Sequence, residues 1–315
     1  MSKTHLDRRP ASIGLGYTGR PSVSDRLSVS VFTAARPSAT LWIVATPIGN
    51  LEDIAPRAVR VLRQAAVIAA EDTRHSARLT RPLGIDTPML SLHEHNEQAR
   101  TEQLLARLAD GDDVALISDA GTPLISDPGF VLVRAVRRAG FPIQSVPGPC
   151  AAIAALSIAG LPSDRFVFEG FLPAKATPRA ARLAELAAET RTLVFYESSH
   201  RIGKCVADMA RVFGAERQIT LCRELTKLHE QSVSLSAEAI GEWLLADDNH
   251  RRGEFVLVVA GAPVRQETTP SLDVDALLAE LLAITGTRPA AKIVARLTGM
   301  PRNEAYARAL EMASH

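Results

Sequence analysis

Hydrophobic and polar positions follow two alternating patterns from residue 41 onwards. Short apolar runs, which are typical of buried strands, occur at 41–45, 66–70, 114–117 and 143–146. Apolar residues recur at helical spacing over 54–65, 97–109, 131–139 and 151–159. Strands that alternate with helices in this way predict an α/β layer built around a mostly parallel sheet.

A second series of elements follows the turn-forming residues 160–163. Strand-like runs occur at 166–169, 192–196, 219–222, 232–235 and 255–259, and helical patterns at 179–189 and 201–212. Because several of these strands are close in sequence, we expect a second α/β domain with more antiparallel pairing. After a polar linker, 289–297 and 301–312 flank a glycine-containing turn, which predicts a helix-turn-helix-like pair.

These patterns divide the chain into four predicted parts: a flexible basic tail (1–39), an N-terminal α/β domain (40–160), a C-terminal α/β domain (161–265) and a helical segment (266–315). The tail contains a GxGxxG string at 14–19, but neither a strand before it nor a helix after it is predicted, so a dinucleotide site is not expected. The helical segment is basic from residue 288 onwards. It suits either a cap on the core or on a dimer partner, or an RNA-docking module.

Composition narrows the class of protein. Of the 315 residues, 46% are hydrophobic and 23% are charged, which excludes a largely disordered chain and a long coiled coil. The net charge is only +1, so any contact with nucleic acid must come from local patches. The three cysteines form no CxxC pair, and we predict neither a membrane span nor a signal segment. We therefore expect a cytoplasmic protein.

Polar residues cluster where the predicted strands end. The clusters follow four strands, at 46–53, 71–75, 118–129 and 147–150. In open α/β sheets, ligands bind outside the carboxyl ends of the strands. Glycines in such turns let the backbone approach a ligand closely, and prolines hold the loop in place. The sequence therefore predicts a binding cleft at this edge of the first sheet.

The string at 93–97 is a candidate metal site. On an extended strand His93, His95 and Glu97 would share one face, and two histidines with a carboxylate can hold a metal. The spacing is not that of an HExxH motif, so we expect no metal. Contact with a polar substrate or a solvated loop fits the string better.

Several long strings together are recognisable. They lie at 44–53, 70–74, 93–97, 118–123 with 127–129, 147–149, 196–201 and 223–227. Through these strings the chain resembles the tetrapyrrole methylase superfamily and, within it, the branch that methylates ribosomal RNA. The resemblance runs from about residue 41 to 261, and the C-terminal helical segment is also similar. It implies two α/β domains of tetrapyrrole methylase type with a cofactor cleft between them.

The resemblance also implies an activity. The chain would use S-adenosyl-L-methionine (SAM) to methylate the ribose 2′-oxygen of cytidine 1402 in 16S rRNA of the small ribosomal subunit, usually as a homodimer and without a metal. The residues implied in cofactor binding are Pro47, Gly49, Ser118, Asp119, Ala120, Gly121, Thr122, Pro123, Gly148, Cys150, Ala151, Tyr196 and Leu225. Cys150 is a departure, because relatives often have Ser or another small residue there.

A ribose hydroxyl is a poor nucleophile until its proton is removed, so the reaction needs a general base. The candidate catalytic residues are Asp72, Arg74, His95 and Glu197. The candidates for RNA phosphate binding are Arg74, His200, Arg201, Arg223 and Lys227. Structural salt bridges are the alternative interpretation of each of these residues.

Three other functions remain open. The first is a small-molecule methyltransferase acting on a tetrapyrrole precursor. The second is a metal-dependent hydrolase built on His93, His95 and Glu97. The third is a non-catalytic RNA-binding protein that would not bind SAM.

Overall fold

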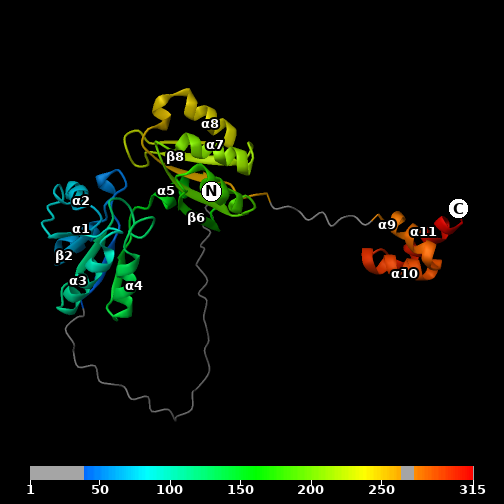
Figure 1. The fold of residues 1–315 in the computed structure, drawn as a ribbon, viewed down its shortest axis with the longest axis horizontal. Coiled ribbons are helices and arrows are strands. Elements are labelled where there is room, and N and C mark those ends of the chain that lie inside the picture. The colour runs from blue at the N-terminus through cyan, green and yellow to red at the C-terminus, as the bar shows by residue number, and fades with distance from the viewer. Residues whose placement is uncertain (1–38, 264–272, 315) are drawn as a thin grey trace, which may run out of the picture. The chain divides into compact units, whose positions relative to one another are not determined.

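The computed structural model describes residues 39–263 and 273–314 (Figure 1). Residues 1–38 of the predicted tail, including the GxGxxG string, lie outside the described residues, and so does most of the predicted linker. Ala39, the last residue of the predicted tail, is buried in the core. The four-part division of the chain stays a prediction.

The first sheet consists of five parallel strands in the order β3-β2-β4-β1-β5. The strands are β1 (Leu41–Val44), β2 (Val67–Ala70), β3 (Met89–Ser91), β4 (Val114–Ile117) and β5 (Ile143–Val146). Every residue of β2 and β4 is buried, as continuous apolar runs in a parallel sheet require. The predicted parallel α/β layer is therefore confirmed.

Helices cover both faces of this sheet. They are α1 (Pro56–Gln64), α2 (Thr73–Thr80), α3 (Glu97–Ala109) and α4 (Phe130–Arg138). Side chains of β4 alternate between two cores: Val114 and Leu116 pack with α3 and α4, whereas Ala115 and Ile117 pack with α1. Figure 1 shows α3 and α4 together on their side of the sheet. The connections that leave β1 and β4 therefore run over opposite faces.

This arrangement creates a crevice between two neighbouring strands. Because the chain leaves β1 and β4 in opposite directions, their carboxyl ends form a topological switch point, where ligands bind in open α/β sheets. Thr46 after β1 and Gly121 after β4 bridge this point with two backbone hydrogen bonds, of 2.8 and 3.1 Å. The turns that the sequence predicts as cleft-forming therefore meet here.

The second sheet is mixed and has the order β6-β7-β10-β8-β9. Its strands are β6 (Phe166–Phe171), β7 (Thr192–Ser198), β8 (Gln218–Arg223), β9 (Gln231–Ser236) and β10 (Glu254–Val259). Only β6 and β7 pair in parallel, so the expected antiparallel character is confirmed. A 3-10 turn, Asp248–Arg251, precedes β10, and another, Leu51–Asp53, precedes α1.

Different helices pack on the two faces of the second sheet. One carries α6 (Ala176–Leu186), α7 (Ile202–Phe213) and α8 (Ala237–Ala246). The other is covered by α5 (Ala151–Ile158), which follows the last strand of the first sheet. Its Ala152, Ala155 and Leu156 pack against Val194 of β7 and Val256 of β10. This helix joins the two α/β layers beside the crevice.

Three C-terminal helices form a separate small core. They are α9 (Val274–Ile284), α10 (Thr287–Thr298) and α11 (Arg302–Ala313). Leu278 packs with Val294 and with the small residues Ala290 and Ala305, which let the helices approach closely. Gly299 ends α10 with φ 74°, a left-handed conformation that favours glycine. The predicted helix-turn-helix-like pair is present. None of the described helices is long and apolar enough to cross a membrane.

Candidate functional site

A cavity of about 520 Å³ lies where the strand ends of the first sheet face the second sheet. The first sheet contributes the turns after β1, β2 and β4, and α5 contributes its first residue. The second sheet contributes the end of β6, the end of β7 and the segments around 225–227 and 253–256. The cavity therefore opens at the edge that the polar strand-end turns predict.

Two glycines let loops from the two sheets approach each other closely. A Cβ on Gly49 would collide with the side chain of Lys227 and lie 3.0 Å from Oγ1 of Thr226. A Cβ on Gly170, which has φ +63°, would lie 2.7 Å from Oγ of Ser126. Larger side chains at these positions would push the loops apart. The shape of the cavity thus depends on glycine at both contacts.

Backbone strain is concentrated in the same loops. Leu124, Ser126, Glu224 and Thr226 have positive φ, between 52° and 73°, without being glycine. Such conformations cost roughly 1–2 kcal/mol per residue and cluster at functional sites. They hold Ile125 and Ser126 on one wall of the cavity and Leu225 on the other.

Carboxylates form one wall of the cavity. Glu71 follows β2 directly, and Asp119 and Asp127 belong to the loop after β4. Burial, followed by the charges of Asp119 and Asp127, raises the pKa of Glu71 to about 7. Burial also raises the pKa of Asp127 to about 6, although a hydrogen bond with Ser118 opposes the shift. Glu71 is thus poised to exchange a proton near neutral pH.

Aromatic side chains lie on the side of the cavity that the second sheet forms. The phenol oxygen of Tyr196 accepts a hydrogen bond from the Ala152 backbone N–H at 3.1 Å. Its ring packs edge-on against Phe168 and Phe171, with centroids 5.0 and 5.6 Å away. Burial, followed by the neighbouring Cys150 thiol, raises the pKa of Tyr196. The phenol therefore stays neutral and joins α5 to the second sheet.

The residues implied in cofactor binding fall into two groups. The members that line the cavity are Asp119, Ala120, Gly121, Thr122, Ala151, Tyr196 and Leu225. The others, Pro47, Gly49, Ser118, Pro123, Gly148 and Cys150, are not in its lining. One of them, Ser118, contacts the lining loop, since its Oγ donates a hydrogen bond to the Ala120 carbonyl oxygen at 3.3 Å.

Three of the four candidate catalytic residues lie outside the cavity lining. Asp72 is exposed and begins α2, where its carboxylate accepts hydrogen bonds from the backbone N–H groups of Arg74 and His75. These hydrogen bonds lower its pKa. Arg74 and His95 are exposed. Glu71, one residue before Asp72, is the carboxylate that lines the cavity, and it was not among the sequence candidates.

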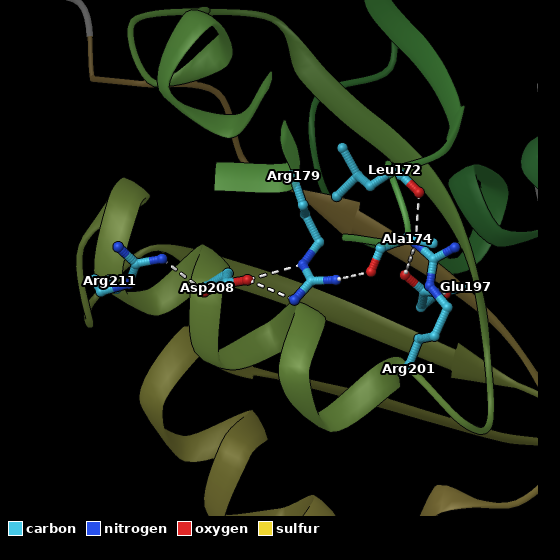
Figure 2. A network of polar contacts seen from close by, with 7 residues as sticks. All are labelled: Leu172, Ala174, Arg179, Glu197, Arg201, Asp208 and Arg211. Carbon is cyan, nitrogen blue, oxygen red and sulfur yellow. Dashed lines mark hydrogen bonds and ion pairs between the residues drawn. The ribbon is translucent and has the colours of Figure 1, made fainter. Parts of the chain in front are cut away.

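Glu197 lines the cavity but belongs to a buried polar network (Figure 2). Its side chain is 0% exposed and pairs with Arg201, with an Nε–Oε1 distance of 3.1 Å. Arg201 also donates a hydrogen bond to the Leu172 carbonyl oxygen at 2.5 Å. Arg179 binds the Ala174 carbonyl oxygen and pairs with Asp208 nearby. The network holds the segment that follows β6, beside the cavity wall formed by Phe171.

The other candidate phosphate-binding residues differ in their surroundings. His200 is exposed. Arg223 is only 7% exposed and donates hydrogen bonds to the Arg252 carbonyl oxygen and to Oε1 of Gln231. Lys227 lines the cavity, but its ammonium group pairs with Glu224 at 2.8 Å and with Glu254 at 2.7 Å. Both Arg223 and Lys227 therefore have structural partners.

The candidate metal string does not form the extended strand considered for it. Glu97 is the first residue of α3 and is 8% exposed. Its Oε1 accepts hydrogen bonds from the backbone N–H groups of Gly129 and Val131, at 3.0 and 2.9 Å, at the start of α4. The shared face of His93, His95 and Glu97 is therefore not formed. No group of three potential metal ligands occurs among the described residues.

Replacing Glu97 by Ala should destabilise the first α/β layer. The N-terminus of α4 loses a buried acceptor for its free N–H groups, and we expect the free energy of unfolding to fall by about 2 kcal/mol. Urea denaturation followed by tryptophan fluorescence measures this change. Glu94→Ala is the matched control, because Glu94 is exposed. An unchanged stability combined with loss of bound metal would contradict this role.

Comparisons with known proteins identify the family. Residues 40–241 match the profile of Tetrapyrrole (Corrin/Porphyrin) Methylases, and residues 268–313 match the RsmI C-terminal HTH domain. The chain is 53% identical to Ribosomal RNA small subunit methyltransferase I of Pseudomonas aeruginosa, over 87% of this chain and 98% of that protein. It is 48% identical to the protein of the same name from Escherichia coli O157:H7, over 89% and 97% of the two chains.

Solved structures support the same fold. Uroporphyrin-III-C-methyltransferase from Thermus thermophilus aligns with a TM-score of 0.51 and 23% identity, over 71% of this chain and 95% of that one. Cobalt precorrin-4 methyltransferase aligns with a TM-score of 0.54 and 17% identity, over 70% and 94%. The predicted fold class is confirmed. The chain belongs to the tetrapyrrole methylase family and, within it, to the ribosomal RNA small subunit methyltransferase I family.

Proposed function

We propose that this chain transfers a methyl group from SAM to the ribose 2′-oxygen of cytidine 1402 in 16S rRNA of the small ribosomal subunit. The cavity with the carboxylate wall is the observation that carries the proposal, because the carboxylates Glu71, Asp119 and Asp127 all lie within residues 40–241, which match the methylase profile. The relatives named for ribosomal RNA methylation match nearly their whole length, including the C-terminal helices.

The cavity suits SAM in size and chemistry. Its volume of about 520 Å³ lies within the roughly 300–1,000 Å³ range of cofactor pockets. Apolar groups of Ile48, Leu225 and Val256 offer contact to an adenine ring, and the loop at 119–122 brings backbone groups to the cavity. The carboxylates of Glu71 and Asp127 complement a positive charge. When bound, SAM supplies a methyl group on a sulfonium, and it becomes a neutral thioether when that methyl group leaves.

Glu71 is our candidate for the proton acceptor. Methyl transfer requires that the ribose hydroxyl lose its proton as its oxygen forms the new bond to carbon. A carboxylate with a pKa of about 7 is partly ionised at neutral pH and basic enough to accept that proton. Asp72, by contrast, is exposed and has a lowered pKa because it accepts two backbone hydrogen bonds at the start of α2. We therefore assign the role to Glu71 and give Glu197 a structural one.

A labelling assay tests the proposed reaction. Methyl-labelled SAM is offered with small ribosomal subunits that lack the modification, with free 16S rRNA and with a tetrapyrrole precursor, and RNA nucleosides are separated by mass spectrometry. We expect label in 2′-O-methylcytidine from the subunits. Label in the tetrapyrrole alone would establish the small-molecule alternative, and no label in any substrate despite SAM binding would contradict methyl transfer.

The setting of the reaction follows from the same proposal. We propose that the chain works in the cytoplasm on the small ribosomal subunit and that it forms a homodimer, as the family resemblance implies. Sedimentation equilibrium of the full chain distinguishes a monomer of 33.8 kDa from a dimer.

A further inference from the structure

The exposed side of α10 carries a row of three cations. Arg288, Lys292 and Arg296 are four residues apart, so they share one face of the helix and follow each other at about 6 Å along its axis. All three side chains are exposed. The opposite side of α10 is fixed, because Ala290 and Val294 are buried in the core of the three C-terminal helices. The row is therefore held in place by a folded unit.

Ion pairing separates this row from Arg308, another cation of the segment. Arg308 pairs with Asp275, with an Nε–Oδ1 distance of 3.0 Å, and so ties α11 to α9. Within residues 273–314, the three members of the row make no ion pair and no side-chain hydrogen bond. Arg302, the first residue of α11, is also exposed, so within residues 273–314 the exposed cations without an ion pair are the row on α10 and this single residue on α11.

The row works against the stability of the isolated helix. Like charges four residues apart repel each other, and Arg288 lies in the first turn, where the helix dipole disfavours a cation. A regular line of negative charges would relieve both effects. The phosphate backbone of RNA is such a line, and its binding would release counterions from the RNA.

We propose that this row, Arg288, Lys292 and Arg296, is a phosphate-binding surface for the RNA substrate, so that the first helix of the helix-turn-helix pair contacts the RNA. In DNA-binding helix-turn-helix proteins the second helix enters the groove. Here the second helix, α11, exposes Glu304 and Glu311, which repel phosphate, and only one cation without an ion pair among the described residues, Arg302. The inference rests on the proposed function, because it takes ribosomal RNA as the partner.

The salt dependence of subunit binding tests the row. The full-length triple variant Arg288→Gln, Lys292→Gln and Arg296→Gln is compared with wild type in binding small ribosomal subunits from 50 to 200 mM salt. We expect weaker binding, and a slope of log Kd against log salt that is shallower by about 2 to 3, close to one per phosphate contact. The double variant Arg288→Lys and Arg296→Lys should keep the wild-type slope, since it keeps the charges.

A matched control removes three exposed cations from elsewhere: Arg60→Gln, Arg137→Gln and Arg138→Gln, on α1 and α4. It should leave the slope within about one of wild type. Equal slopes for the row variant and wild type would overturn the inference, and so would equal losses in the row and control variants. A loss confined to Arg302→Gln would also overturn it, because the contact would then lie on α11. Failure of wild type to methylate subunits would instead contradict the proposed function.

Discussion

Glu71→Gln is expected to lower kcat by about 100- to 10,000-fold, the usual contribution of a general base, while the Kd for SAM changes by less than about tenfold. The substitution keeps the shape of the side chain and one hydrogen-bonding oxygen, but it removes the proton acceptor from the carboxylate wall. Single-turnover methylation of small ribosomal subunits measures the rate. Glu102→Gln is the matched control, because Glu102 is exposed, lies on α3 and is not in the cavity lining.

The pH dependence follows from the raised pKa. Only ionised Glu71 accepts a proton, so kcat/KM of the wild type should rise with pH and level off above about 7. A cation bound beside the carboxylate lowers its pKa, so the rise in kcat should come at lower pH than the rise in kcat/KM. In Glu71→Gln this rise of kcat and kcat/KM with pH should be absent. If the variant keeps both the wild-type rate and the rise of that rate with pH, another group is the base.

The same raised pKa predicts the effect on stability. The pKa of Glu71 in the folded chain lies above the ordinary value of 4.5, so its contribution to stability is present below about pH 4.5 and is lost as pH rises through 7. At pH 8 the folded chain therefore holds an unfavourable charge, which Gln removes. We expect Glu71→Gln to unfold at the same Tm as wild type or slightly higher at pH 8, which separates lost chemistry from a lost fold.

Arg201→Met is expected to lower the free energy of unfolding by about 3 kcal/mol, or Tm by roughly 6–12 °C. The variant leaves the fully buried carboxylate of Glu197 without its cation and removes the hydrogen bond that holds the Leu172 carbonyl oxygen (Figure 2). Thermal unfolding followed by circular dichroism measures the shift.

Arg211→Met is the control for this network. Arg211 pairs with Asp208, but its side chain is 63% exposed, so its loss should cost less than about 1 kcal/mol. Glu197→Gln adds a second test, because it removes the charge of the partner and keeps its shape. An unchanged Tm in Arg201→Met, together with weaker RNA binding, would support the role in phosphate binding for which the sequence makes Arg201 a candidate.

The sequence predicts the first layer well because its strands β2 and β4 are buried on both faces. A buried strand such as Val114–Ile117 needs an unbroken apolar run, and that run is visible without a structure. The hydrophobic pattern does not predict three other elements. Met89–Ser91 has only three residues, Thr73–Thr80 is a mostly polar helix, and Ala237–Ala246 follows a strand directly without a separating turn.

The chemistry of the cavity is harder to read from the sequence. Glu71 and Asp72 are adjacent carboxylates, and only the fold turns one toward Asp119 and Asp127 and uses the other to begin a helix. The burial of Glu97 likewise depends on where α4 starts. Strand-end turns locate a cleft from sequence alone, whereas the charge state of each carboxylate depends on contacts between segments far apart in the chain.

A crystal structure of the full chain with SAM tests the location of the reaction site most directly. We predict SAM in the cavity between the two sheets, with its methyl-bearing end beside the carboxylates of Glu71 and Asp127 and its adenine near Leu225. SAM bound outside this cavity, or inside it with the methyl-bearing end turned away from Glu71, would contradict the assignment of the reaction site.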